Sequence, residues 1–107
     1  MYMSQFNNVT VNIAANIYFD GGVISRSIYL ADGSHKTLGV ALPGQYQFTT
    51  QVEELMEFYS GEVEVLLPEE TMWQTITAGM SFVVPAEATF HLRVLTISDY
   101  CCSYERS

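Results

Sequence analysis

Short stretches of alternating hydrophobic and polar residues follow one another along the chain, and turn residues separate them. The alternation is clearest over residues 62–65, where Val63 and Val65 would share one face of a strand while Glu62 and Glu64 share the other. The pattern predicts strands near residues 9–13, 23–30, 36–42, 45–50, 55–59, 62–67, 72–77, 81–84, 90–97 and 100–104. Many short strands separated by turns are typical of an all-β sandwich or barrel.

Glycine and proline mark the turns between the predicted strands, because glycine accepts a positive φ and proline fixes φ. They stand, often beside Asp or Ser, at residues 20–22, 31–34, 43–44, 60–61, 68–70, 78–79 and 85. At Ser60-Gly61 we expect a tight hairpin joining strands 55–59 and 62–67. The alternative for residues 52–60 is an amphipathic helix with its glutamates on one face, but nine residues are short for a helix and both flanks are predicted strands.

The chain has 107 residues, which is room for one domain with one core. Hydrophobic residues make up 49% of the chain and charged residues 15%, so we expect a folded domain and not a disordered chain. We assign residues 16–107 to this domain. Residues 1–15 are interpreted as an N-terminal arm or edge strand, with a loose segment or an exchange between partners as the alternatives.

The charge balance excludes two classes of partner. Twelve acidic and four basic residues give a net charge of -8, and such a surface repels nucleic-acid phosphates and anionic lipids. The N-terminus shows neither a basic start with a long apolar run nor a small-residue cleavage pattern, so we expect no signal peptide, no membrane segment and a cytoplasmic location. Cys101 and Cys102 are adjacent, which excludes a disulfide framework and predicts two thiols on a late strand.

Two glycine-centred patterns occupy the second half of the chain. In the first, Glu54 precedes Gly61 by seven residues and an alternating strand follows; in the second, Gly79 precedes Pro85 by six residues and a strand begins near Phe90. This arrangement resembles the two signature blocks of the cupin superfamily. The resemblance implies a small cupin-type (RmlC-like) β-barrel or jelly roll in a single domain.

The histidines that bind metal in cupins are not matched here. Residues 47–50 read Gln-Phe-Thr-Thr where a metal-binding cupin has its His-x-His pair, and Phe90 stands where the last histidine belongs. His91 is one residue late, which on a strand means the opposite face. Too few ligands remain for tight binding of a divalent ion, so we expect no metal.

A closer resemblance runs through most of the chain. It rests on Asn16-x-Tyr18-Phe19, Lys36-Thr37-Leu38-Gly39-Val40, Pro43-Gly44-x-Tyr46-x-Phe48, Glu54-x-Met56 with Gly61, Trp73, Ala78-Gly79-x-x-Phe82-x-Val84-Pro85, Phe90-x-Leu92-x-Val94 and Tyr100-Cys101-x-x-Tyr104. Together these motifs resemble the small single-domain pyrimidine/purine nucleoside phosphorylases of bacteria, which are metal-independent cupins. The resemblance implies broad-specificity phosphorolysis: a nucleoside and inorganic phosphate give the free base and a pentose 1-phosphate, in a homodimer with no cofactor beyond the phosphate.

Phosphorolysis of an N-glycosidic bond needs a clamp for the phosphate anion. We expect Lys36 and the adjacent His35 to bind phosphate, because residues 32–37 also offer backbone N–H groups and hydroxyls, with Arg93 as a further candidate. Arg26 and Arg106 are the other formal cations, one in a polar early strand and one at the end of the chain. The alternative for His35 and Lys36 is a solvated turn.

Glu54 and His91 are the candidate catalytic acids. Inside a cupin-like barrel Glu54 would be desolvated, which would raise its pKa and let it protonate the leaving base or bind a ribose hydroxyl. The alternative is a solvated turn glutamate. His91 shares a face with Arg93, but the apolar residues that alternate with them need the core face, so solvent or a dimer surface is the alternative for both.

Base stacking would accept purines and pyrimidines alike, since every base has a π-face. Tyr46, Tyr59 and Phe90, with Phe48, are the candidates for this aromatic wall, and core packing is the alternative for the two phenylalanines. Two other functions stay open. One is a non-enzymatic cupin that binds a small molecule; the other is a metal-dependent cupin oxygenase or isomerase, which the missing histidines disfavour.

Overall fold

The described part of the chain, residues 4–105 of the computed structural model, is built from short strands. They are β1 (Thr10–Val11), β2 (Asn16–Tyr18), β3 (Val23–Tyr29), β4 (His35–Ala41), β5 (Gly44–Thr49), β6 (Glu54–Ser60), β7 (Glu62–Leu66), β8 (Gln74–Thr77), β9 (Ser81–Val84), β10 (Thr89–Val94) and β11 (Ser98–Tyr104), with a 3-10 turn η1 (Phe19–Gly21). All the predicted strands are present, which confirms the all-β class; β2 and η1 are additional. Residues 1–3 of the predicted arm and residues 106–107, with Arg106, lie outside the described residues.

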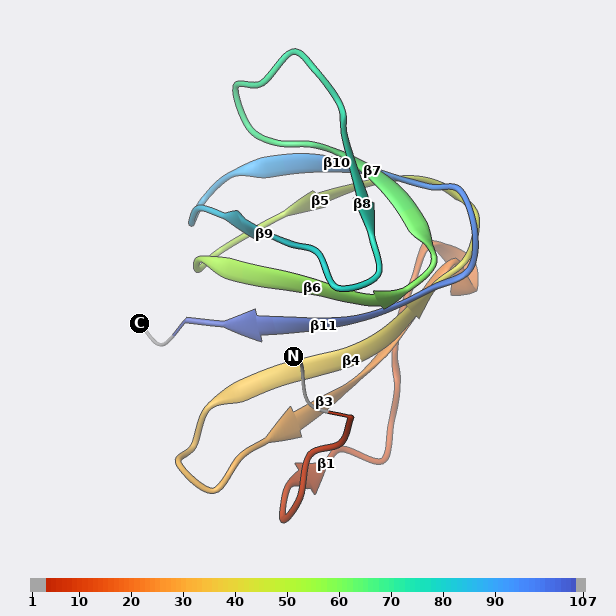
Figure 1. Ribbon diagram of the computed structural model, residues 1–107. Helices are drawn as coiled ribbons and strands as arrows, with labels where there is room; N and C mark the ends of the chain where they lie inside the picture. The colour runs from red at the N-terminus through yellow and green to blue at the C-terminus, as the bar shows by residue number, and fades with distance from the viewer. Residues whose placement is uncertain (1–3, 106–107) are drawn as a thin grey trace.

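Two antiparallel sheets face each other and enclose the core (Figure 1). The larger sheet has the strand order β1-β3-β4-β11-β6-β9, with β2 also paired to β3, and the smaller sheet has the order β5-β10-β7-β8. Strands far apart in the sequence are therefore neighbours. In particular, β11 lies between β4 and β6, and β10 lies between β5 and β7.

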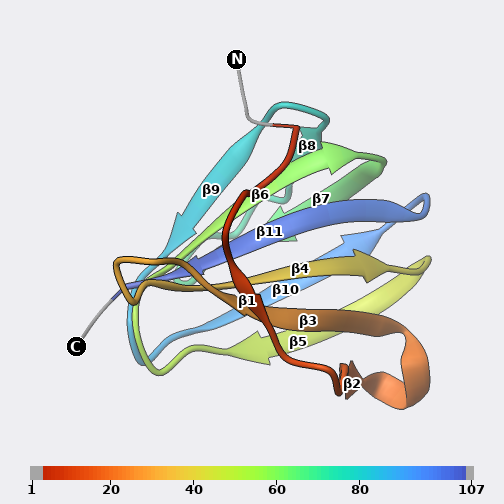
Figure 2. The ribbon, with the colours of Figure 1, turned by 90° about the horizontal axis from the view of Figure 1, so that it is seen from below.

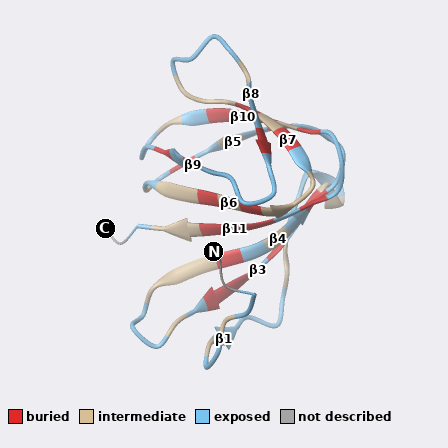
Figure 3. Cartoon of the chain, in the orientation of Figure 1, coloured by how far each residue is buried: buried red, intermediate tan, exposed pale blue. Residues whose placement is uncertain are grey.

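Burial follows the period of two that the sequence predicts (Figure 3). In β7, Val63 and Val65 are fully buried while Glu62 is exposed and Glu64 is half-buried. The hydrophobic core between the sheets consists of Val23, Ala41, Tyr46, Met56, Phe58, Val63, Val65, Ile76, Phe82, Val84, Phe90, Leu92, Val94, Tyr100 and Cys102. Most of these side chains come from alternate positions of their strands, so one face of each sheet is apolar and packs on the other sheet.

The structure of residues 52–61 differs from both the helix and the hairpin considered for this segment. The helix over residues 52–60 is wrong, because this segment contains strand β6. The hairpin at Ser60-Gly61 is also wrong, because β6 pairs with β11 and β9 whereas β7 pairs with β10 and β8 in the other sheet. The chain crosses between sheets here. Gly61 has a φ of +89°, and a Cβ at this position would lie 2.6 Å from the carbonyl oxygen of Ile97, so the corner requires glycine.

The N-terminal segment runs along the edge and across the outer face of the larger sheet (Figure 2). Both β1 and β2 pair with β3, but residues 12–15 between them oppose only two residues of β3, so the edge strand is interrupted by a bulge. Further towards the N-terminus, the ring of Phe6 lies 5.9 Å from the Lys36 ammonium on the outer face. The described part of the arm is thus an irregular edge strand preceded by a segment laid across the sheet.

Candidate functional site

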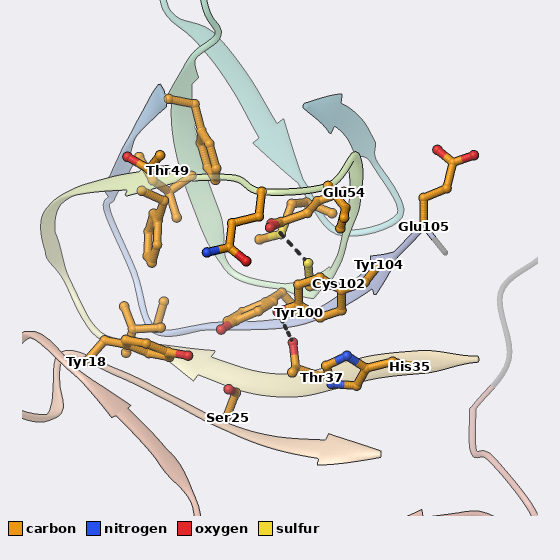
Figure 4. A pocket seen from close by; sticks show the side chains of 18 of the residues that line it. Tyr18, Ser25, His35, Thr37, Thr49, Glu54, Tyr100, Cys102, Tyr104 and Glu105 are labelled. Carbon is orange, nitrogen blue, oxygen red and sulfur yellow. Dashed lines mark hydrogen bonds between the residues drawn. The ribbon is translucent and has the colours of Figure 1, made fainter. Parts of the chain in front are cut away.

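A cavity of about 730 Å³ lies between the two sheets (Figure 4). The exposed Gln51 and Glu105 line one end of it, so its mouth lies where the β5–β6 connection and the end of β11 come together. The larger sheet supplies a mostly polar wall and the smaller sheet an apolar one. Small-molecule sites have this volume and this combination of an apolar lining with a few polar groups.

Strand register places four side chains in one row across the larger sheet. Tyr29 of β3, His35 of β4, Tyr104 of β11 and Glu54 of β6 are successive cross-strand neighbours. The imidazole of His35 is stacked between two phenol rings, 4.8 Å from that of Tyr29 and 4.6 Å from that of Tyr104, each at 14°. Its Nε2 atom is buried and has no hydrogen-bond partner within residues 4–105, and such an atom suits a bound ligand.

Glu54 is half-buried and projects into the cavity (Figure 4). The Cys102 thiol donates a hydrogen bond of 3.4 Å to Glu54 Oε1. Burial raises the pKa of the Glu54 carboxyl, and this hydrogen bond lowers it by a smaller amount. Burial and the nearby Glu54 charge together raise the pKa of Cys102, so Cys102 is a neutral thiol that orients the carboxyl.

Two hydroxyl groups lie next to this pair. Tyr104 and Thr37 share a hydrogen bond of 3.3 Å between the phenol oxygen and Thr37 Oγ1. Burial, followed by the proximity of Cys102, raises the pKa of Tyr104. The phenol is therefore neutral and can donate a hydrogen bond as well as accept one.

Further into the barrel, Tyr100 of β11 lies across Gly39 of β4, which is its cross-strand neighbour. Burial raises the pKa of the Tyr100 phenol as well, and the nearby Ser25 hydroxyl lowers it by a smaller amount. The amide of Asn16 in β2 donates hydrogen bonds of 3.2 Å to Ser25 Oγ and to Ser27 Oγ. The unpredicted strand β2 thus holds the hydroxyl groups on the inner face of β3.

The opposite wall of the cavity comes from the smaller sheet and is apolar. Phe48 of β5 and Phe90 of β10 are paired in register, with ring centroids 5.4 Å apart at 22°. Phe19 of η1 packs edge-on against Phe48, also at 5.4 Å, and Leu92 continues the wall. This wall offers a flat aromatic surface opposite the polar row.

Four of the predicted site residues line the cavity: Glu54, His35, Phe90 and Phe48. Glu54 and His35 lie on one row of the larger sheet, two strands apart, with Tyr104 between them. Phe90 is buried and belongs both to the core and to the cavity wall. The catalytic and binding roles assigned to these residues stay predictions.

The two predicted phosphate-binding cations do not line the cavity. Lys36 follows His35 on β4 and therefore points to the outer face, where its ammonium donates a hydrogen bond of 2.7 Å to Ser103 Oγ. Arg93 lies on the outer face of the smaller sheet, 2.9 Å from Glu64 Oε1 and 4.0 Å above the ring of Trp73. Both cations are held by protein groups on the surface.

The predicted anion-binding loop is also occupied by internal contacts. Asp32 Oδ1 accepts hydrogen bonds from the Ser34 amide at 2.8 Å and from the Ser34 hydroxyl at 2.6 Å. The Gly33 amide donates to the Leu30 carbonyl oxygen. These groups close the β3–β4 turn, and only His35, Thr37 and Gly33 from this region reach the cavity.

The other predicted residues lie elsewhere. His91 is on the outer face of β10, because the buried Phe90, Leu92 and Val94 take the inner face. Tyr46 is buried outside the cavity lining and donates a hydrogen bond of 2.8 Å to the Leu42 carbonyl oxygen. Tyr59 lies over the outer face of the larger sheet, in a groove shared with Leu38 and Val40.

Tyr100, Cys102 and Tyr104 line the cavity but are not among the predicted site residues. Their signal is the period of two along β11, which puts all three on the same face. Choosing between that face and the one with Cys101 requires knowing that the N-terminal segment covers part of the outer face. No pattern in the sequence predicts this contact between the N-terminal segment and the sheet.

The charged side chains in the cavity, and the possible metal ligands among the described residues, limit the chemistry of the site. No lysine or arginine of residues 4–105 lines the cavity, whereas Glu54 and Glu105 do. No group of three or more His, Cys, Asp or Glu side chains within that range is placed to hold a metal ion. A search of the same residues finds no helix that is both long and apolar enough to span a membrane.

Comparison with known proteins decides the family. The family model described as pyrimidine/purine nucleoside phosphorylase matches residues 13–104. The chain belongs to this family. A relative of that name from Hydrogenovibrio crunogenus is 59% identical over 102 residues, which is 95% of this chain and 98% of the relative. A second, from Chlorobium chlorochromatii, is 55% identical with the same coverage of both chains.

Solved structures place the family fold among the cupins. A crystal structure of a protein of unknown function from Acinetobacter sp. ADP1 superposes with a TM-score of 0.92 at 41% identity and covers 94% of this chain and 98% of its own. An RmlC-like cupin from Shewanella frigidimarina superposes with a TM-score of 0.70 at 15% identity and covers 100% of this chain and 92% of its own. The predicted cupin-type barrel is confirmed.

Proposed function

We propose that this protein is a nucleoside phosphorylase, which converts a purine or pyrimidine nucleoside and inorganic phosphate to the free base and pentose 1-phosphate. The observation that carries the proposal is one cavity that joins a polar row to an aromatic wall, in a chain of this family. The enzyme would be a pentosyltransferase of nucleoside salvage in the cytoplasm. The chemistry needs no further cofactor.

The aromatic wall of the cavity suits the base of the nucleoside, and the polar row suits the pentose and the phosphate. Phe48 and Phe90 offer an aromatic surface on which purines and pyrimidines both stack. The row of His35, Tyr104 and Glu54 offers donors and an acceptor for phosphate and the pentose hydroxyls. Holding both reactants in one cavity orients the phosphate oxygen towards the anomeric carbon, from which the base departs.

Release of base from uridine and adenosine, with and without phosphate, tests the proposal. We expect uracil and adenine to form only when phosphate is present, together with pentose 1-phosphate. Glu54→Gln, purified in the same way, should lose most of this activity, whereas Glu57→Gln on the outer face of β6 should keep it. A wild-type protein that releases no base with phosphate would contradict the phosphorylase function and favour non-enzymatic binding of a small molecule.

A homodimer is part of the proposal, and the outer face of the larger sheet is its candidate interface. Ile24, Leu38 and Val40 are 38 to 40% exposed there and line a groove with Arg26 and Asp99, which carry opposite charges. Apolar side chains on an exposed sheet face favour association with a second copy. Light scattering should give twice the chain mass, and Leu38→Glu should give the monomer.

The absence of a metal is a further expectation, and metal analysis tests it. Protein purified without added metal should contain much less than one equivalent of iron, manganese or zinc. Activity should survive dialysis against a chelator. Stoichiometric metal, or activity lost on chelation and restored by a metal, would revive the metal-dependent class of cupins.

A further inference from the structure

The cavity would have to bind an anion without a lysine or arginine. All three such residues within 4–105 are held outside it: Lys36 by Ser103, Arg93 by Glu64, and Arg26 by the Ile13 carbonyl oxygen at 3.4 Å. The cavity instead contains the carboxyl groups of Glu54 and Glu105. A fully ionised dianion would meet repulsion here, with no formal cation to offset it.

The groups of the polar row suit an anion that carries a proton. Tyr104 and Thr37 offer neutral hydroxyl groups, and His35 Nε2 is buried without a partner within the described residues. Among the described residues, Cys102 gives Glu54 its single side-chain hydrogen bond, so the carboxyl has capacity for a ligand. A carboxylate accepts a hydrogen bond from an acidic hydroxyl, and such O–H···O⁻ bonds are short and strong.

We propose that Glu54 shares a proton with the bound oxyanion, so that the cavity selects phosphate or arsenate, which carry an acidic hydroxyl, over sulfate, which does not. The inference rests on the proposed function, in which phosphate is the co-substrate. It adds that the cavity binds phosphate as an anion that carries a proton. His35, Tyr104 and Thr37 donate to the remaining oxygens. The shared proton turns what would be a repulsive contact between two anionic oxygens into a hydrogen bond, which offsets part of the repulsion between the carboxylate and the anion.

The preference follows from the source of the proton. Phosphate brings its own, whereas sulfate binds Glu54 only after the carboxyl has taken a proton from water, which becomes unfavourable as the pH rises. The ionisable groups that line the cavity with Glu54 in the described part of the chain are Cys102, Tyr104 and Tyr100 of β11, His35 of β4, Tyr18 of β2 and Glu105 at the mouth. The smaller sheet faces it with apolar side chains, so no other charge within the described residues compensates for the carboxylate.

Isothermal titration at about pH 8 and constant ionic strength tests the selection, with phosphate, arsenate and sulfate as separate ligands. We expect wild-type protein to bind phosphate and arsenate at least about tenfold more tightly than sulfate. In Glu54→Gln the amide donates to any tetrahedral oxyanion, so phosphate binding should weaken and the preference over sulfate should fall towards one. Glu57→Gln, which changes a carboxyl on the opposite face of the same strand, should keep the wild-type preference.

Three results would overturn the selection: sulfate binding as well as phosphate to wild type, an unchanged preference in Glu54→Gln, or no phosphate binding at all. Circular dichroism of each variant shows that the comparison is made on folded protein. The binding measurements can be interpreted independently of the phosphorolysis assay. Preferential phosphate binding without base release would contradict the enzyme function and support the selection. Phosphate-dependent base release that sulfate inhibits with a Ki no higher than the phosphate KM would support the enzyme function and contradict the selection.

Discussion

The ring of Tyr100 lies directly on Gly39: a Cβ added to this glycine would be 2.6 Å from Tyr100 Cζ and 2.6 Å from its hydroxyl oxygen. Gly39 therefore leaves room on β4 for a side chain of β11. The phenol reaches across the strand to Ser25, which Asn16 holds in turn. A chain of contacts over β2, β3, β4 and β11 thus sets the inner end of the cavity.

Gly39→Ala should displace this ring. The added methyl group overpacks the site, and we expect a loss of about 1–3 kcal/mol in the free energy of unfolding together with reduced turnover. Tyr100→Phe keeps the ring and removes only the hydroxyl, so it should cost about 1 kcal/mol. Urea unfolding and the phosphorolysis assay measure both effects. An alanine variant as stable and as active as wild type would show that the ring is not held as the structure indicates.

His35 and Lys36 are adjacent and point to opposite faces of β4, which makes them a matched pair. His35→Ala removes the only imidazole in the described lining of the cavity and should raise the phosphate KM at least about tenfold, by loss of a hydrogen bond to an anion. Lys36→Ala removes a surface contact with Ser103 and should leave the phosphate KM within about twofold of wild type. Initial rates at varied phosphate measure both constants. The opposite order would restore Lys36 to the phosphate clamp.

The pKa of Glu54 links stability to pH. Burial raises this pKa above its value in the unfolded chain, so the neutral form is favoured in the folded state. The contribution of Glu54 to the free energy of unfolding is fully present below the pKa of the unfolded chain, and it is lost as the pH rises through the pKa of the folded state. Glutamine stays neutral, so the Tm of Glu54→Gln relative to wild type should increase from about pH 4 to about pH 8.

Thermal melts of both proteins across this pH range provide the measurement. Cys102→Ala is a useful companion, because it removes the hydrogen bond that lowers the pKa of Glu54. Its loss of stability with rising pH should extend to a higher pH than in wild type, because only the folded pKa of Glu54 is raised further. A Tm difference between Glu54→Gln and wild type that is constant with pH would mean that the folded and unfolded pKa values are the same.

The strands were predictable because their signals are local. Alternation, glycines and prolines lie within a few residues of one another, and they predict β7 and its buried valines directly. The corner at Gly61 shows the limit. A glycine with positive φ serves a hairpin and a crossing between sheets equally well. The choice depends on the pairing of β6 with β11, which begins only at Ser98.

The residues of the candidate site also fall into two groups, those that local spacing predicts and those that depend on the pairing of distant strands. Glu54 and Phe90 follow from local spacing, but the assignment of Lys36 to the phosphate clamp rests on its formal charge. Register decides instead: His35 lies beside Tyr29 and Tyr104 on the inner face, and Lys36 one residue later lies outside. Arg93 is similar, since it contacts Glu64 of β7 and Trp73 in the segment before β8, and only the fold brings these regions together.

Phe48 tests the aromatic wall. Phe48→Leu keeps most of the apolar volume but removes the flat surface that pairs with Phe90, so core packing should change little. Stacking of a base on an aromatic ring contributes about 1–3 kcal/mol, so the KM for uridine and adenosine should rise about fivefold or more while the phosphate KM stays the same. Phe82→Leu is the matched control, because Phe82 also packs against Phe90 but lies outside the cavity lining. It should lower the Tm and leave both KM values unchanged. Equal nucleoside KM values in Phe48→Leu and wild type would place the base elsewhere in the cavity.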